Sequence, residues 1–339
     1  MEQTKKVYYD ELNIYRALII FWVVLGHAFE EGSSVFGFLH AYAYTFHMAA
    51  FFALSGFLLA PKLKEAKSLK AKPILILDRA KRLLVPFYFF SAVSVALKLV
   101  FDKFAKNPFA DNYSLLDFIL GRNNPNGGLW FLQTLFVLSI VFILLSNIPD
   151  IAVFALSLIL KISLIFYMPK SKFLIICMYY AVYLSLGVLV RNSYPAIQSF
   201  MKRLTKRKAL SIVSAICMLV IALLLSPYKK AMGDFETLLM LYNIFVWYFI
   251  AFIINEYHLL KNPLMIIGDY GMDIYMLGYY VQIAIRVLFA QILGLSELVY
   301  SPLMLVFGFL LPIPISKYFV RKFRLTSALM LGSFPKKDK

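Results

Sequence analysis

Long apolar runs alternate with short polar connections along nearly the whole chain. Ten runs qualify as membrane-spanning helices, since about 18 or more mostly apolar residues suffice to cross a bilayer. They lie at residues 12–30, 40–60, 83–101, 129–148, 151–168, 173–190, 209–226, 238–255, 272–294 and 301–319. The pattern predicts an all-α fold, a polytopic membrane bundle of about ten transmembrane helices that forms one domain over residues 1–339.

The composition agrees with this pattern. Of the 339 residues, 61% are hydrophobic and 16% are charged, whereas soluble domains average about one-half and one-quarter. The first run follows its charged leader without a small-residue cleavage site, so we expect it to be retained as a span. Both cysteines, Cys177 and Cys217, lie in apolar runs, which argues against a disulfide framework or a metal site.

The basic residues predict the orientation. The net charge is +17, but Lys and Arg gather in alternate connections: eight in residues 61–82, six in 191–208 and seven from Lys317 onwards. Basic connections stay on the cytoplasmic side, so an even number of spans puts both termini in the cytoplasm. We therefore expect a multi-pass protein of a bacterial plasma membrane, whose basic residues face membrane lipid and not nucleic acid.

The first span carries two ionisable residues in the stretch RALIIFWVVLGH. Arg16 and His27 are eleven positions apart, which is three helical turns plus about 20°, with a rise of about 16 Å. They therefore share a face at different depths and do not touch. Glu30 and Glu31 follow at helical spacing and are expected on the same face, where a carboxylate would orient the imidazole. Ionisable residues inside spans usually mark function.

The second and third spans add further candidates at graded depths. His47 lies near the expected level of His27, and Ser55 lies deeper. Arg79 and Arg82 share a face at the cytoplasmic start of the third span, where they suit a phosphate. These residues form a column that fits a phosphorylated donor from the cytoplasm and an acceptor from outside, with a neutral histidine as general base.

Each candidate also fits a purely structural role. Arg16 suits a snorkelling side chain, His27 and His47 suit packed histidines, and Arg79 and Arg82 suit topology determinants. Ser55 suits a close helix contact, and Trp130 suits the aromatic belt at the outer start of the fourth span. Two further intramembrane charges, Lys161 and Arg286, have no partner that the sequence indicates.

Four segments together resemble the acyltransferase family 3 membrane proteins. ELNIYRALIIFWVVLGH resembles the first helix of the family, with its arginine, ten residues and a histidine. FHMAAFFALSGFLLA, DRAKRLLVPFY and LWFLQTLF resemble three later segments in the expected order. The first two segments are most similar to the fucose 4-O-acetylase-like branch. The chain departs from the family pattern at Gly271 and Gly278, where serine and histidine are common.

The resemblance implies transfer of an acyl group, usually acetyl from acetyl-CoA, to a hydroxyl of an extracytoplasmic sugar or polysaccharide, without a metal. By matching position, His27 is the expected catalytic base, Arg16 its partner residue, Arg79 and Arg82 the CoA phosphate site, and Trp130 a site-lining residue. Direct attack and a covalent acyl-histidine relay both fit. The alternatives are a transporter or flippase of a lipid-linked sugar and a non-catalytic scaffold. The oligomeric state is not indicated.

Overall fold

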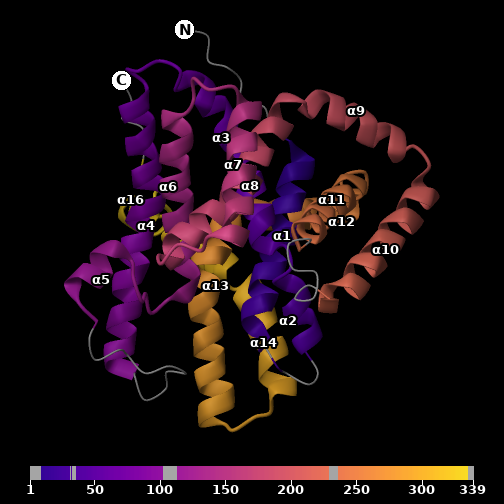
Figure 1. Ribbon diagram of the computed structural model, residues 1–339. Helices are drawn as coiled ribbons and strands as arrows, with labels where there is room; N and C mark the ends of the chain where they lie inside the picture. Colours follow the sequence, from indigo (N-terminus) through magenta and orange to yellow (C-terminus); the bar gives the residue numbers. More distant parts are fainter. Residues whose placement is uncertain (1–8, 31, 33–35, 102–112, 229–235, 335–339) are drawn as a thin grey trace. The chain divides into compact units, whose positions relative to one another are not determined.

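Every regular element among the described residues is a helix. The computed structural model describes residues 9–30, 32, 36–101, 113–228 and 236–334 (Figure 1). The helices gather into two compact units. The first unit comprises Met1–Leu54, Ser193–Gln282 and Ser301–Ile313, and the second comprises Ser55–Asn192, Ile283–Tyr300 and Pro314–Lys339. The single domain over residues 1–339 stays a prediction.

Nine helical segments in the described part of the chain are long and apolar enough to cross a membrane. They are Asp10–Ala28, Gly37–Glu65, Lys72–Phe101, Gly127–Leu144, Lys172–Asn192, Lys208–Tyr228, Glu236–Ile254, Gly271–Ile292 and Glu297–Val320. The predicted span at 151–168 is helix α7, Asp150–Phe166, of 17 residues. A helix of that length measures about 26 Å, slightly less than a hydrocarbon core of about 30 Å. The polytopic helical membrane fold is confirmed, and the count of ten stays a prediction.

Helix α1, Asp10–Ala28, is enclosed within the first unit. It packs against α2 (Gly37–Ala43), α11 (Glu236–Ile254) and α12 (His258–Asp269). Within its span 72% of the residues are buried, compared with 22% for Lys208–Tyr228. Polar side chains of α1 therefore meet other protein groups, whereas the span at Lys208–Tyr228 has most of its surface available to lipid.

The core of the first unit forms along one side of α1. Ile20, Val23 and Val24 pack with Ile274 of α13, Gly271–Ile285. Trp22 joins a buried aromatic group in which the Trp247 indole donates to the Tyr42 hydroxyl at 3.0 Å. The remaining helices of this unit are α9 (Tyr194–Leu204), α10 (Lys208–Leu225), and α14 (Glu297–Leu310) from Ser301 onwards.

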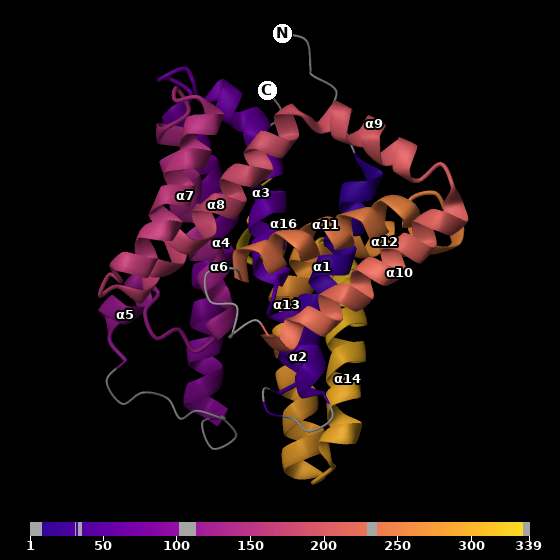
Figure 2. The same ribbon diagram turned by 45° about the vertical axis from the view of Figure 1, so that its right-hand side comes forward.

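The second unit is built on α3 (His47–Glu65) from Ser55, α4 (Lys72–Phe101), α6 (Trp130–Leu144), α7 and α8 (Lys172–Asn192). Helices α7 and α8 lie side by side (Figure 2). The Lys72 ammonium donates to the Leu144 carbonyl at 3.0 Å, and the Asn192 amide donates to Asp150 at 2.6 Å. These contacts gather the start of α4, the α6–α7 turn and the end of α8 at one end of the unit. The predicted alternation of spans requires this arrangement.

A small-residue contact joins α3 to α8 in the second unit. A Cβ on Gly56 would lie 1.9 Å from the Leu184 carbonyl oxygen. No side chain fits between these helices at that point. The Ser55–Gly56 pair therefore allows the close helix approach that its sequence predicts.

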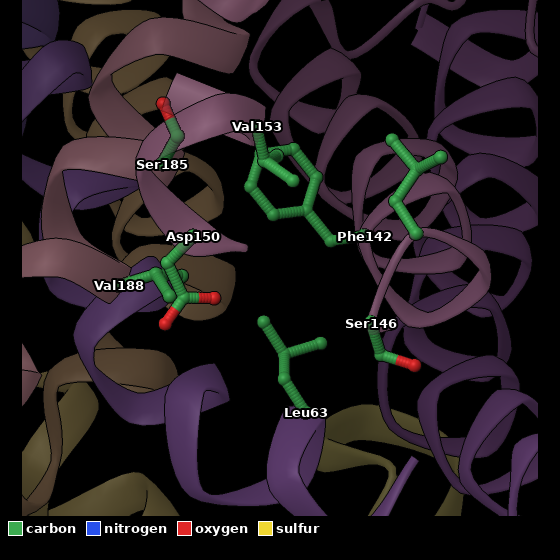
Figure 3. A pocket seen from close by; sticks show the side chains of 8 residues that line it. Leu63, Phe142, Ser146, Asp150, Val153, Ser185 and Val188 are labelled. Atoms are coloured by element: carbon green, nitrogen blue, oxygen red, sulfur yellow. The ribbon is translucent and has the colours of Figure 1, made fainter. Parts of the chain in front are cut away.

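A small recess lies at the end of the second unit where Asp150 meets Asn192 (Figure 3). Its lining is mostly apolar, and it has room for about one water molecule. The residues that line it are Leu63, Phe142, Leu145, Ser146, Asp150, Val153, Ser185 and Val188. A space of this size does not accommodate a substrate.

A short helix lies in the connection between α4 and α6. Helix α5, Leu115–Leu120, begins with a capping box between Ser114 and Asp117. Hydrogen bonds from Ser114 hold the pKa of Asp117 below its ordinary value, so this carboxylate stays ionised at neutral pH. The Gln133 amide donates to the Leu120 carbonyl at 2.6 Å and fixes α5 to α6. Residues 102–112 of this segment lie outside the described residues.

Single cysteines on either side of α7 test whether this helix crosses the membrane. In a Cys177→Ala, Cys217→Ala background, we expect Ser171→Cys to react with a membrane-impermeant maleimide on intact cells. Asn147→Cys should react only after permeabilisation, because basic connections put the α6–α7 turn in the cytoplasm. Equal protection of both cysteines in intact cells would mean that α7 does not cross, and that the termini lie on opposite sides.

Candidate functional site

Three of the four histidines of the chain surround one tyrosine in the first unit. Tyr44 lies in the turn between α2 and α3. Its ring centroid is 6.4 Å from that of His27, 4.4 Å from that of His40 and 5.0 Å from that of His47. The sequence predicts His27 and His47 at a similar depth, and the structure brings both to the same aromatic ring.

His27 is the accessible member of this group. It stands in the last turn of α1, where most residues are buried, yet its own side chain is exposed. A Cβ on the preceding Gly26 would lie 3.1 Å from the Tyr44 ring, so the small residue lets α1 approach Tyr44. On another side, the Tyr279 ring of α13 lies 6.3 Å from His27. The imidazole is therefore flanked by two phenol rings, and its side chain is exposed.

The expected carboxylate beside His27 is not on the helix. Helix α1 ends at Ala28, and Phe29 has extended backbone angles of φ −103° and ψ 141°. Glu30 therefore follows the helix end, and the prediction that it shares the helical face of His27 is wrong. The spacing argument failed because it assumed that the helix continued to residue 31. Glu31 itself lies outside the described residues.

His47 is held in place rather than open. The predicted span at 40–60 lies within the segment Gly37–Glu65, which consists of two helices, α2 and α3, with a turn at residues 44–46. His47 is the first residue of α3. Its ring is buried, and its Nδ1 is paired with the Ala43 carbonyl at 2.5 Å. His47 therefore helps to shape the turn that carries Tyr44, whereas His27 is available for chemistry.

Arg16 lies where α1 crosses α12, away from the histidine group. Its Nη1 donates to the Asn13 side chain at 3.3 Å and to the Gly268 carbonyl at 3.4 Å. The Asn13 amide in turn donates to Asp269 at 3.0 Å and to the Met265 carbonyl at 2.8 Å. A Cβ on Gly268 would lie 2.3 Å from the Asn13 carbonyl oxygen. Arg16 and His27 therefore contact different parts of the unit, as their helical spacing predicts.

The two departures from the family pattern are sites of close packing. A Cβ on Gly271 would lie 2.9 Å from Cδ of Arg16. A Cβ on Gly278 would lie 2.7 Å from the Gly308 carbonyl oxygen of α14. Near the same crossing, the buried Gln282 amide donates to the Val24 carbonyl of α1 at 2.8 Å. In this chain both glycines therefore let helices approach, and a larger side chain has no space at Gly278.

The predicted phosphate-binding arginines lie in the second unit with a third cation. Arg79, Arg82 and Lys62 are close enough to repel one another electrostatically, and Asp78 and Glu65 partly offset this repulsion at Lys62. The Nε atom of Arg79 is buried, and no described group accepts its hydrogen bond. Helix α16, Arg324–Leu331, packs on α4 beside them, with its C-cap Gly332 against the Arg82 backbone. Such a concentration of positive charge favours an anionic ligand.

Trp130 and Lys161 belong to one aromatic group in the second unit. Trp130 begins α6, and its ring centroid is 5.4 Å from that of Tyr180 on α8. The Lys161 ammonium of α7 donates to the Tyr183 hydroxyl at 2.7 Å and lies 3.9 Å from the Tyr179 ring centroid. Cation–π and hydrogen-bonding contacts of this kind stabilise a charge within hydrocarbon. The tyrosines on α8 are thus partners of Lys161 that the sequence alone did not indicate.

The predicted column draws on residues of both units. Arg16, His27 and His47 belong to the first unit, and Ser55, Arg79, Arg82 and Trp130 belong to the second. Ser55 is half-buried beside the close contact of Gly56. The continuity of the column stays a prediction.

Two residues that the sequence did not single out join the site. Tyr44 contacts three histidines because a turn interrupts the second span, and apolar runs do not reveal such turns. Asn13 accepts a hydrogen bond from Arg16 and donates one to Asp269. Its position three residues before Arg16 on a helix could have predicted the contact with Arg16.

Substitutions at the two glycines should have different effects. Gly278→Ala places a methyl group against a backbone oxygen that cannot move independently, so it should lower the melting temperature, as overpacking costs about 1–3 kcal/mol. Gly271→Ala meets the Arg16 side chain, which can rotate, so it should lower the melting temperature less. Thermal unfolding of the purified variants in one detergent provides the measurement. Equal losses of stability would contradict this difference between the two sites.

Comparison with known proteins identifies the family. The sequence profile of the acyltransferase domain of family 3 matches residues 9–317, nearly the whole chain. No curated protein and no solved structure matches the chain. The profile covers both units, including Arg16 and His27 in the first and Arg79 and Arg82 in the second. The chain therefore belongs to acyltransferase family 3, a family of membrane acyltransferases.

Proposed function

We propose that this acyltransferase is an O-acetyltransferase of the bacterial plasma membrane, in the fucose 4-O-acetylase-like branch of its family. It transfers an acetyl group from cytoplasmic acetyl-CoA to a hydroxyl of an extracytoplasmic sugar or polysaccharide. The family supports acyl transfer. The observation that carries the finer proposal is the exposed imidazole of His27 at the end of an otherwise enclosed helix, between the rings of Tyr44 and Tyr279.

His27 acts as the general base. A neutral imidazole is the usual proton acceptor near neutral pH. It takes the proton of the acceptor hydroxyl while that oxygen attacks the thioester carbonyl. The carbon–sulfur bond then breaks, the CoA thiolate leaves, and the proton passes from the imidazolium to the thiolate or to water. A positioned base of this kind contributes about 10²–10⁴-fold to the rate.

Arg79 and Arg82 hold the phosphates of acetyl-CoA in this proposal. Their mutual repulsion with Lys62 and the unpaired Nε of Arg79 support it, because phosphate oxygens accept charge-assisted hydrogen bonds from guanidinium groups. Ser55 lies on the donor side. Arg16 positions α1 through its hydrogen bonds to Asn13 and Gly268. In this proposal its guanidinium also stabilises negative charge on the donor.

In this proposal Trp130 lines the acceptor side, whereas the buried His47 acts through the turn that carries Tyr44. The half-buried indole of Trp130 provides an apolar ring face beside Tyr180. Tryptophan and tyrosine combine an apolar ring with an N–H or O–H group, which suits a sugar with apolar faces and hydroxyl groups. A membrane lipid environment and a carbohydrate acceptor are the expected partners, and the reaction as proposed uses no metal.

The role of His27 is tested by substitution with a matched histidine control. Reconstituted His27→Gln should lose about 10²–10⁴-fold in transfer of label from acetyl-CoA to an acceptor glycan, since the general base is removed. His258→Gln, an exposed histidine at the start of α12 and outside the Tyr44 group, should retain the wild-type rate. Full activity of His27→Gln would exclude His27 as the base. Absence of label transfer by wild type with all glycans tried would argue against the enzyme.

The role of the arginine pair is tested through the dependence on donor concentration. Arg79→Gln and Arg82→Gln should raise the KM for acetyl-CoA by about 10–100-fold, because a hydrogen bond between charged groups contributes about 1.5–3 kcal/mol. Lys70→Gln, an exposed cation of the connection before α4, should leave KM unchanged. Unaltered KM in both arginine variants would assign these residues to topology alone.

A further inference from the structure

Helix α9 is too short to be a membrane-spanning helix. It spans Tyr194–Leu204 between α8 and α10, and its 11 residues measure about 16 Å. A hydrocarbon core is about 30 Å thick, so α9 does not cross it. Figures 1 and 2 show a sharp turn between α9 and α10. The segment lies in one of the strongly basic connections, which predicts a cytoplasmic position.

One face of α9 is anchored to the first unit. Met201 is fully buried, and with Ile197 it packs against Phe249 and Phe252 of α11. This face gives α9 a fixed orientation, because the two residues lie four positions apart on one side of the helix.

A buried polar contact joins the same face of α9 to the start of α1. The hydroxyl of Tyr194 and the amide of Gln198 both donate to one oxygen of Glu11, at 2.7 Å and 2.5 Å. Glu11 is only 5% exposed. Burial, with further contributions from Tyr248 and Glu11, raises the pKa of Tyr194 well above its ordinary value, so the hydroxyl stays protonated and donates. Helix α9 therefore holds the cytoplasmic end of the helix that carries Arg16 and His27.

A second face of α9 is apolar and uncovered. Phe200 is 56% exposed and Leu204 is 43% exposed. They lie four positions apart, about 40° around the helix; Phe200 is about 100° and Leu204 about 60° away from the buried Met201. This stripe therefore adjoins the anchored face and extends it to an exposed side of the helix.

A third feature is a group of exposed cations at the end of α9. Lys202 and Arg203 occupy its last turn, and Lys206 and Arg207 follow directly. Within the described part of the chain, none of these four side chains pairs with a carboxylate. Four uncompensated like charges beside an apolar stripe are typical of a helix that lies at the surface of an anionic membrane.

We propose that α9 lies on the cytoplasmic leaflet, with Phe200 and Leu204 among the acyl chains and Lys202, Arg203, Lys206 and Arg207 on anionic lipid headgroups. Because Glu11 ties this helix to α1, the membrane surface then stabilises the position of the catalytic helix. The interaction depends on lipid charge and is separate from the donor site at Arg79 and Arg82.

The depth of α9 is measured with spin labels on the full-length protein. In a Cys177→Ser, Cys217→Ser background, Phe200→Cys and its neighbour Ser199→Cys each carry a nitroxide. The protein is reconstituted in vesicles of phosphatidylcholine alone or mixed with phosphatidylglycerol. In the mixed vesicles, the label at 200 should be more accessible to oxygen than to an aqueous nickel chelate, and the label at 199 should show the opposite order.

The dependence on lipid charge separates headgroup binding from insertion driven by the apolar stripe alone. Immersion of the label at 200 should be greater with phosphatidylglycerol, and this difference should disappear when the four cations are replaced by glutamine. High nickel accessibility at 200 in both lipids would overturn the proposal, as would equal immersion in both. A change at 199 caused by acetyl-CoA without any effect of phosphatidylglycerol would assign the cations to a nucleotide phosphate, and would overturn the lipid assignment.

Discussion

The enclosure of α1 by protein is the constraint on which the candidate site depends. In a helix surrounded by other helices in hydrocarbon, charged and amide groups without partners are the most costly. Glu11, Asn13 and Arg16 are accordingly bound by α9 and α12. Gly268 lets α12 approach closely enough to receive Asn13. Because this end of α1 is held so firmly, the opposite end can present His27 at a defined place beside Tyr44.

The second unit contains two groups of positive charge with different surroundings. Lys161 is satisfied internally, by the hydroxyl of Tyr183 and the rings of two tyrosines. Arg79, Arg82 and Lys62 instead repel one another. The first arrangement is complete within the protein, whereas the second would be stabilised further by the bound anion that we propose. This contrast is the physical reason for assigning ligand binding to the arginines and a structural role to the lysine.

Local patterns account for the parts that were predicted correctly. Apolar runs located the helices, because crossing hydrocarbon requires about 20 apolar residues whatever lies beside them. The helical period separated Arg16 from His27 on one helix, and both contact different neighbours as expected. The same period failed at Glu30, since it does not indicate where a helix ends, and the apolar run at 40–60 did not indicate the turn at residues 44–46.

The sequence by itself determined the class of protein, nine of its predicted spans and its family, because hydropathy and motif spacing are properties of neighbouring residues along the chain. Only the tertiary structure decided which polar residues are satisfied and which are available. The approach of His27 to Tyr44, Glu11 bound by α9 and the tyrosines around Lys161 all depend on contacts between different helices. Such contacts are selected by the packing of whole helices, and a single sequence carries no local signal for them.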